Sequence, residues 1–419
     1  MPIIPNVRPW RTGVLAVTVI TGLLATVATA GERAVLAGDF HAWIDGPLRR
    51  AAAERGVSGT TFEVAFAGVE LDWSVPDLRP PGAPDVADDW RQSEFRAPSR
   101  YFAQGSIETL ARQGRGHMAR LQGALDRIER EYGVPREILV AIWGRESAFG
   151  TAAIPHDAVQ ILATQAFIGR RRAMFAEELF AALAILERGT VQRAALRSSW
   201  AGALGQPQFL PSKYLAFAVD GDGDGRRDIW NSEADTLASI ANFLRRSGWQ
   251  SERDWGFEAR VPEGMSCAME GPDRGMAIDE WIGLGVTRVS GRPFPDHERK
   301  GAGFLLMPAG RYGPAFIATE NFYVLKAYNE SDLYALFIGH LADRMRSGGA
   351  FVAPWADVGG FSRGDVHALQ RHLEQAGYDV GGADGLIGFK TRRSVGDFQA
   401  RNGWTPTCYP DGELIAKIR

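Results

Sequence analysis

The stretch that most restricts the fold of this chain is residues 132–150, YGVPREILVAIWGRESAFG. Pro135 stands where a helix can begin, because its ring fixes φ near the helical value and the first turn needs no amide donor there. Leu139, Ile142 and Trp143 then recur at the spacing of one apolar helical face. The pattern therefore predicts a helix with one face in the protein core.

Glu146 is the exception on this apolar face, because it occupies the next position of the stripe. Gly150 offers a helix stop soon afterwards, so Glu146 is predicted near a helix end that a cleft can reach. From this segment alone two interpretations remain open. Either Glu146 is a structural residue that is capped or paired with Arg145 or a distant arginine, or it is a functional carboxylate.

The charge and length of the chain narrow the classes of function. A formal net charge of −3 argues against a nucleic-acid binder, because no net basic field attracts phosphates. A length of 419 residues predicts two folded units with an appendage. The 12 tryptophans, 9 tyrosines and 22 phenylalanines include enough aromatic rings for sugar-binding platforms, although most of them are expected to belong to the core.

Residues 1–30 have the pattern of an export signal. Arg8 and Arg11 form a positive region, residues 14–27 are apolar, and residues 28–30 form a small-residue cleavage site. The apolar run is somewhat short for a membrane span, and an uncleaved anchor remains an alternative to a cleaved signal. We therefore expect the protein to work outside the cytoplasm.

Cys267 and Cys408 are the two cysteines of the chain. Export makes a disulfide chemically accessible, and their separation places them in different predicted domains. Two unpaired structural thiols are the alternative. Neither cysteine has neighbours typical of a nucleophile or a metal site.

Helical periodicity dominates the chain, with one exception. Short strands and turns are predicted at about residues 255–325, a glycine-rich linker at 348–360, and a small helical module after it. The expected fold class is mainly α with a small β-containing subdomain.

A calcium loop is the most specific physical signal in the chain. Carboxylates stand at positions 1, 3, 5 and 9 of the segment that begins at Asp220, and Gly225 stands at position 6, as in an EF-hand loop. Position 12 holds Asn231 in place of the usual glutamate, so Asp235 is the better closing carboxylate. We expect a structural calcium ion and no organic cofactor. The predicted ligands are Asp220, Asp222, Asp224, Arg226 through its carbonyl, Asp228 and Asp235.

Three other segments place polar groups among apolar or aromatic ones. Residues 199–211 put Ser199 and Gln208 among small and aromatic residues, which suits either a sugar site or a tightly packed turn. Residues 170–172 are three arginines, which form either a solvated face or a site for anionic groups. Residues 328–334 form a polar and aromatic cluster.

Together these segments resemble the lytic transglycosylase B family of peptidoglycan-cleaving enzymes, over nearly all of the chain after the export segment. The segment at 132–150 matches with Glu146 as the family's catalytic acid and base, and residues 220–228 match its calcium loop. One departure is Phe243, where the family often has a tyrosine. The substrate-binding residues that the resemblance implies are Tyr101, Arg171, Arg172, Ser199, Gln208, Phe209, Tyr328, Asn329 and Tyr334.

The resemblance also implies an architecture and a location. A lysozyme-like transglycosylase core is expected over residues 31–347, and residues 361–419 resemble a peptidoglycan-binding domain, a small three-helix module. The expected location is the periplasm, the expected partner is the peptidoglycan glycan strand with no nucleic acid, and a monomer is expected.

The implied reaction cleaves the bond between N-acetylmuramic acid and N-acetylglucosamine and leaves a 1,6-anhydro end. The sequence offers no convincing second carboxylate of the kind that hydrolytic glycosidases use. A single glutamate in an apolar pocket would instead protonate the leaving oxygen and then accept the proton of the muramoyl C6 hydroxyl. The alternatives are a hydrolytic muramidase that uses the same glutamate and a non-catalytic scaffold that binds the cell wall.

Overall fold

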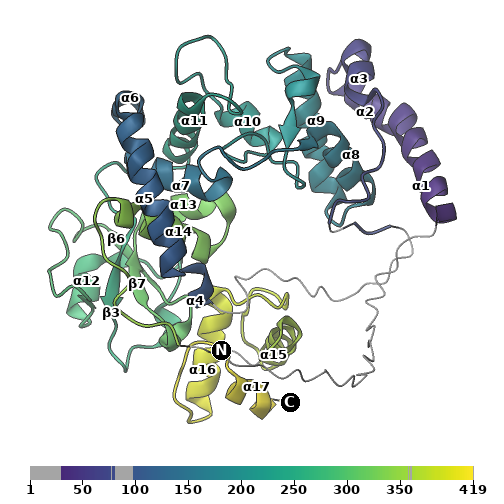
Figure 1. Cartoon of the computed structure of the whole chain (residues 1–419). Coiled ribbons are helices and arrows are strands. Elements are labelled where there is room, and N and C mark those ends of the chain that lie inside the picture. The colour runs from purple at the N-terminus through teal and green to yellow at the C-terminus, as the bar shows by residue number, and fades with distance from the viewer. Residues whose placement is uncertain (1–29, 77, 81–97, 357, 359–360, 419) are drawn as a thin grey trace, which may run out of the picture.

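The computed structural model describes residues 30–76, 78–80, 98–356, 358 and 361–418. Within them, buried apolar side chains gather into four clusters, which belong to a central helical body, an N-terminal helical lobe, a small sheet and a C-terminal module. The chain is therefore mainly α-helical with a small antiparallel sheet, as the sequence predicts (Figure 1).

The central body is built around α7, Arg136–Ser147, most of which is buried. Helices α5 and α14 pack on α7 from both sides, and α6 packs chiefly on α11. The apolar run of α7 is enclosed because α5, α6, α11 and α14 all contact this helix. The other helices of this body are α4 Pro98–Tyr101, α5 Gln104–Arg120, α6 Gln122–Tyr132, α11 Glu233–Arg246, α13 Glu320–Asn329 and α14 Asp332–Met345.

The N-terminal lobe packs α8 against α9 and covers them with the first helices of the chain (Figure 1). Strands β1 His156–Asp157 and β2 Arg197–Ser198 form a short antiparallel ribbon before α8 and after α9. Helix α10 Pro211–Phe217 contacts both α9 and α11, so it joins this lobe to the central body. The lobe's other elements are α1 Ala30–Trp43, a π-helical turn Ile44–Leu48, α2 Arg49–Glu54, α3 Gly59–Phe66, α8 Ala158–Ile168, α9 Arg172–Glu187 and a 3₁₀ turn Arg193–Ala195.

The sheet has five strands in the order β4-β6-β7-β3-β5, and all its neighbours are antiparallel. Its register pairs Phe257 with Ile317 and Leu305 with Ile317, which places buried apolar side chains on one shared face. The elements are β3 Gly256–Arg260, a 3₁₀ turn Cys267–Met269, β4 Met276–Ala277, α12 Ile278–Gly283, β5 Thr287–Arg288, β6 Ala302–Leu306, a 3₁₀ turn Gly310–Tyr312 and β7 Ala315–Ala318.

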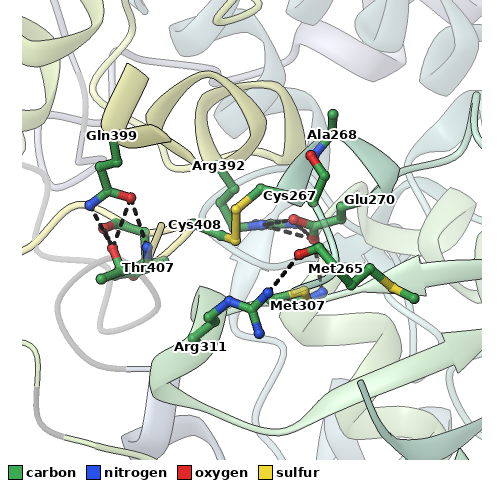
Figure 2. The surroundings of a disulfide bond; sticks show 12 residues. Met265, Cys267, Ala268, Glu270, Met307, Arg311, Arg392, Gln399, Thr407 and Cys408 are labelled. Carbon is green, nitrogen blue, oxygen red and sulfur yellow. Dashed lines mark hydrogen bonds and ion pairs between the residues drawn. A yellow bond between two sulfur atoms is a disulfide. The ribbon is translucent and has the colours of Figure 1, made fainter. Parts of the chain in front are cut away.

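The C-terminal module consists of α15 Arg363–Gln375, α16 Phe389–Arg401 and α17 Gly412–Ile418, with its own apolar core. A disulfide between Cys267 and Cys408 joins it to the 3₁₀ turn that precedes β4 (Figure 2). The bridge decides between the two interpretations of the cysteines, and it does connect the two predicted domains.

The glycine-rich segment before the module lies against the central body where it is described. Trp355 stacks on Phe102 with ring centroids 5.1 Å apart, and Phe351 stacks on His340 at 3.9 Å. The backbone amides of Val352 and Ala353 also donate to the Glu258 carboxylate. The described part of this segment is thus held in place by aromatic and polar contacts.

The predicted export segment, residues 1–30, lies almost wholly outside the described residues. In the part of the chain that is described, no helix combines the length and apolar character that a membrane crossing requires.

Candidate active site

Helix α7 delivers Glu146 to its last turn. Pro135 is the N-cap, and the helix ends at Ser147 with Ala148 in the left-handed region at φ 49°. The helix therefore stops earlier than Gly150, where the sequence predicted its end, because Ala148 already takes the left-handed conformation that is commonest at helix C-termini. Phe149 and Gly150 also have positive φ, and this sharp turn leaves Glu146 at the edge of the body.

Tyr334 is the hydrogen-bond partner of Glu146. Its hydroxyl donates to Glu146 Oε1 at 2.5 Å from the first turn of α14. The N-cap residue Ser331 accepts a hydrogen bond from the Tyr334 amide, which fixes that first turn. Among the described residues, Glu146 forms no ion pair with an arginine, and Arg145 instead donates to the Tyr101 hydroxyl at 2.9 Å.

The surroundings of Glu146 favour a protonated carboxyl. Burial raises the pKa of Glu146, and the hydrogen bond from Tyr334 and the positive charges of Arg145 and Lys213 oppose this rise only in part. The side chain itself keeps partial contact with solvent. A carboxyl with a raised pKa at an accessible edge is suited to donate a proton and to take one back.

Lys213 is a cation near this carboxyl that the sequence analysis did not single out. It lies on α10, its Nζ donates to the Tyr328 carbonyl at 3.1 Å, and it sits over the Phe243 and Tyr328 rings. Burial lowers the pKa of Lys213, whereas the negative charge of Glu146 raises it. The signal in the sequence was a lysine in the first turn of a short helix that begins at Pro211.

Aromatic side chains pack behind the Glu146–Tyr334 pair. Tyr328 stacks on Tyr334 with centroids 6.2 Å apart, and its hydroxyl donates to the Pro207 carbonyl at 2.7 Å. Phe209 and Phe243 both pack on Tyr328. Phe243 is thus a buried packing residue here, in the place where a tyrosine is common in the family.

Tyr101 lies on the other side of the site, at the end of α4. The Arg145 guanidinium covers its ring at 4.7 Å from the centroid, and Phe337 of α14 meets its edge. The fold therefore brings Tyr101 to the neighbourhood of Glu146 through Arg145.

The loop of residues 199–211 is held by its own polar groups. Ser199 Oγ accepts the Ala203 amide at 3.2 Å, and Gln208 Nε2 donates to the Gly205 carbonyl at 2.8 Å. The backbone of Gln208 has φ 54°, a left-handed conformation that residues other than glycine rarely adopt. Ser199 and Gln208 therefore stabilise a tight turn, and the polar atoms that they do not use within it are available to bind a ligand.

Trp143 connects α7 to this loop. Its indole Nε1 donates to Gln206 Oε1 at 2.7 Å, and Gln206 in turn donates to the Trp230 carbonyl at 2.9 Å. Gly150 leaves room for Gln206, because a Cβ at Gly150 would lie 2.5 Å from its Oε1. Gln206 is thus a positioning residue for the loop that sequence reasoning missed.

The arginine pair lies at the start of α9, in the N-terminal lobe. Arg171 is exposed and covers the Phe175 ring, and Arg172 donates to the carbonyls of Gly169 and Arg79. In the described part of the chain, neither guanidinium makes a hydrogen bond with Glu146 or Tyr334. Any contact with a ligand at Glu146 would therefore come from the facing lobe.

Asn329 ends α13 and is exposed, beside a cleft of about 720 Å³. The cleft lies between the turn that joins α13 to α14 and the 380–390 loop of the C-terminal module. Its wall also includes Lys326, Asp332, Lys390 and Arg392, so it is lined by both signs of charge.

The aspartate-rich loop brings three of its predicted ligands together. Carboxylate oxygens of Asp220, Asp222 and Asp235 all lie within 4.8 Å of one another. Hard carboxylate oxygens at this spacing are a donor set that fits Ca²⁺. The carboxylates of Asp224 and Asp228 accept hydrogen bonds from amides of their own loop, from Arg226 and from Trp230 and Asn231 respectively.

Comparison with known proteins agrees with this arrangement. Residues 39–343 match the family of the transglycosylase SLT domain, and residues 362–418 match a family of peptidoglycan binding domains. The membrane-bound lytic murein transglycosylase B of Escherichia coli (strain K12) is 30% identical over 226 residues. That alignment covers 52% of this chain and 59% of the relative, so the chain matches well under two thirds of the length of this curated protein.

Two solved structures are similar over larger shares. SltB3 from Pseudomonas aeruginosa, in complex with NAG-NAM-pentapeptide, is 37% identical with a TM-score of 0.81, over 91% of this chain and 99% of that chain. The Escherichia coli lytic transglycosylase Slt35, in complex with calcium, is 28% identical with a TM-score of 0.52, over 61% of this chain and 80% of that one. This chain is a member of the SLT transglycosylase family, of the type related to lytic murein transglycosylase B, with a C-terminal peptidoglycan-binding domain.

Proposed function

We propose that this chain is a lytic transglycosylase that cleaves the β-1,4 bond between N-acetylmuramic acid and N-acetylglucosamine and leaves a 1,6-anhydro-muramoyl end. The observation that carries the proposal is the set of groups around Glu146. Among the described residues, the side chains that shift the pKa of Glu146 are Tyr334, Arg145 and Lys213, and none of them is a carboxylate. Hydrolytic glycosidases place a second carboxylate about 5–10 Å from the first.

Glu146 serves as acid and then as base in this reaction. With its pKa raised by burial, the neutral carboxyl donates a proton to the glycosidic oxygen as the bond breaks. The carboxylate that remains is stabilised by the Tyr334 hydroxyl and the Lys213 charge. It then accepts the proton of the muramoyl C6 hydroxyl, whose oxygen attacks C1 of the same sugar. A tethered nucleophile has a large proximity advantage over free water.

Substrate contacts come from both sides of the site in this proposal. Ser199, Gln208 and Tyr328 orient the muramoyl ring, whose N-acetyl group assists as an oxazolinium. The Tyr328 hydroxyl already donates its proton to Pro207, so it offers a lone pair to the substrate. Arg171 and Arg172 contact lactate or peptide carboxylates from the facing lobe. The other proposed substrate-binding residues are Tyr101, Phe209 and Asn329.

A calcium ion belongs to the proposal as a structural element. The donors are Asp220, Asp222 and Asp235, supported by the proximity of their oxygens, and by a relative whose structure is in complex with calcium. Asp224, the Arg226 carbonyl and Asp228 would turn toward the ion to complete an EF-hand arrangement. Charge neutralisation there would fix the start of α11, where Asp235 lies.

The proposed location is the periplasm, where peptidoglycan lies, and residues 1–30 are the proposed signal or anchor. The proposed catalytic domain is residues 31–347, and the proposed peptidoglycan-binding domain is residues 361–419, with residues 348–360 between them. We expect a monomer that acts on glycan strands.

Mass analysis of digested peptidoglycan tests the reaction. Purified protein should release fragments with 1,6-anhydro-muramoyl ends, which are lighter by one water than reducing ends. The Glu146→Gln variant should lower the rate by about a hundredfold or more, because it removes the general acid and base. Glu137→Gln is the matched control, since Glu137 is on the same helix but pairs with Arg346.

Two outcomes would contradict the proposal. Reducing muramoyl ends would show a hydrolytic muramidase. If Glu146→Gln released as much product as wild type, Glu146 would not be the catalyst, and if neither protein released any product, a binding scaffold would be favoured.

A further inference from the structure

The C-terminal module reaches the first turn of α14, which carries Tyr334. The contact is Arg392 of α16, whose Nη2 lies 3.2 Å from Asp332 Oδ2. Asp332 is the first residue of α14, and Tyr334 is two residues further on in the same turn. Arg392 and Asp332 are 60 residues apart in sequence, so only the docking of the module creates this contact.

Arg392 is held rigidly in place. Its Nε and Nη2 form a forked pair with the Glu270 carboxylate at 2.6–3.0 Å, and its Nη1 donates to the Ile387 carbonyl at 3.0 Å. Arg392 is 2% exposed and Glu270 is fully buried. A planar guanidinium with its donors fixed in this way cannot swing away from Asp332. Figure 2 shows the Arg392–Glu270 pair beside the Cys267–Cys408 bridge.

Asp332 receives a cation on each of its two oxygens. Lys326 of α13 donates to Oδ1 at 2.7 Å, and Arg392 contacts Oδ2. Burial alone would raise the pKa of Asp332, but Arg392 and Lys326 outweigh it and the pKa is lowered, so Asp332 stays ionised. Asp332 thus ties α13, α14 and α16 together in the turn of α14 that carries Tyr334.

We propose that Arg392 of the C-terminal module is a positioning residue for the reaction, because through Asp332 it holds the first turn of α14 and with it the Tyr334 hydroxyl on Glu146. This inference rests on the proposed function. The module is then a part of the catalytic apparatus as well as a cell-wall-binding unit, and an enzyme without it would hold Tyr334 less accurately. Catalytic groups lose rate steeply when they are displaced by about 1 Å.

The test uses Asp332→Asn in the full chain, which weakens the link to α14 and leaves the Glu270–Arg392 pair intact. We expect kcat to fall roughly tenfold with KM unchanged within about twofold, because a positioning loss acts on the transition state. The alkaline limb of kcat/KM should move to higher pH, as in Tyr334→Phe, because Glu146 loses a hydrogen bond that stabilises its ionised form. The other groups around Glu146 are Arg145 of α7, Lys213 of α10 and Tyr328 of α13, and these are unchanged in the variant.

The double variant Asp332→Asn/Tyr334→Phe separates positioning from a general structural role. If Asp332 acts through Tyr334, adding Asp332→Asn to Tyr334→Phe should cause little further loss. The inference would be overturned if the fold-losses in kcat of the two single variants multiplied in the double variant. It would also be overturned if Asp332→Asn had the kcat and pH profile of wild type.

Arg393→Met is the matched control at the same interface. Arg393 is the neighbour of Arg392 on α16, and it pairs with Asp273 and the Glu270 carbonyl without touching α14. It should keep the wild-type kcat and pH profile within about twofold even if the protein melts at a lower temperature. If kcat fell equally in Asp332→Asn and Arg393→Met, the interface would affect only the stability of the protein, and this result would contradict the inference.

A readout without turnover keeps this inference separate from the proposed function. Carbon-13 labelling of glutamate carboxyls, with the Glu146 signal assigned by its loss in Glu146→Gln, gives the pKa of Glu146 directly. A higher pKa in Asp332→Asn than in wild type supports the positioning role, and an unchanged pKa contradicts it. If wild type forms no anhydro-ended product, the proposed function fails by itself, and this titration still decides the inference.

Discussion

At the scale of the residue, the site rests on one carboxyl with a raised pKa and one phenol that donates to it. The two groups have complementary effects on the reaction. In the proposed reaction, burial raises the pKa of Glu146 and so favours the protonated form that the first step needs, and the Tyr334 hydroxyl stabilises the carboxylate that this step would leave behind. A single carboxyl can therefore serve both halves of an intramolecular transfer.

The Tyr334→Phe variant tests this balance. Without the phenol, Glu146 loses a group that lowers its pKa, so the pKa rises further above its ordinary value. Because the protonated carboxyl is the active form in the first step, the alkaline limb of kcat/KM should move to higher pH. kcat should fall about ten- to a hundredfold, since a hydrogen bond to a charged group contributes about 1.5–3 kcal/mol. The pH–rate profile on purified peptidoglycan checks both effects. If the alkaline limb of kcat/KM stayed in place or moved to lower pH, the proposed role of the hydrogen bond from Tyr334 to Glu146 would be contradicted.

At the scale of the element, the turn that ends α7 contains stored strain. Ala148 and Phe149 both have positive φ, a backbone region in which the Cβ of residues other than glycine is sterically crowded. Their conformation directs the chain away from the helix directly after Glu146, so the strain is located at the site itself.

Replacement of Ala148 by glycine should stabilise the protein. Ala148 is exposed and forms the left-handed cap of α7, so glycine removes the steric cost and takes away little packing. The expected gain is about 0.5–1 kcal/mol, measured as a higher midpoint in urea unfolding. Ala141→Gly, in the buried middle of the same helix, is the control and should destabilise by about 1 kcal/mol or more. A loss of stability in Ala148→Gly would show that the turn carries no relievable strain.

The aspartate-rich loop offers a second test on an element. If Asp220, Asp222 and Asp235 hold Ca²⁺, chelation with EDTA should lower the melting temperature, because a bound ion stabilises only the folded state. At a free-ion concentration about a hundred times Kd the ion contributes about 2.7 kcal/mol. Asp222→Asn should abolish most of the EDTA effect, whereas Asp296→Asn, which changes a highly exposed aspartate elsewhere, should keep it. If Asp224 also binds the ion, Asp224→Asn should reduce the effect of EDTA on the melting temperature.

The calcium proposal would be contradicted if wild type melted at the same temperature in EDTA and in calcium. Magnesium in place of calcium is the second comparison, because Mg²⁺ demands a smaller octahedral site and should restore less of the stability.

At the scale of the whole molecule, the C-terminal module is fixed to the preceding part of the chain by covalent, ionic and hydrogen-bonded contacts. The disulfide closes a sequence separation of 141 residues, and Tyr312 donates to Asp411 at 2.6 Å beside it. Gly396 gives the bridge its room, because a Cβ there would lie 2.2 Å from Cys267 Sγ. The C-terminal module is therefore held in one fixed position against the rest of the protein.

Removal of the disulfide tests this rigidity. The variant with Cys267→Ala and Cys408→Ala should lose about 2–4 kcal/mol of unfolding free energy, because a long loop in the unfolded chain is no longer closed. Its C-terminal module should become sensitive to limited proteolysis at lower temperatures than wild type. A reducing agent should lower the stability of wild type and leave the double variant unchanged. Equal stability of the two proteins without reductant would show that the bridge contributes nothing.

Much of this architecture could be predicted from local patterns in the sequence. The helix that carries Glu146, the loop of alternating aspartates and the strands at residues 256–318 each depend on residues close together in the chain, so periodicity and spacing predict them. The order of motifs also predicted the family. The position of the helix end was less accurate, because glycine is only one of the residues that can take the left-handed cap.

Contacts between distant residues could not be predicted in this way. Glu146 and Tyr334 are 188 residues apart, and Lys213 approaches them from a third helix. No local spacing encodes such a contact, because it exists only when α7, α10 and α14 pack around one core. The pairing of the cysteines was undecided for the same reason.

The sequence by itself determined that a carboxylate must stand at the end of a buried helix, and that three or more aspartates of one loop must lie close together. Both follow from helical and turn geometry within a few residues. Only the tertiary structure decided which groups surround that carboxylate and that the last domain is fixed against the body. The pKa and orientation of Glu146 depend on groups that the fold, and not the chain order, brings to it.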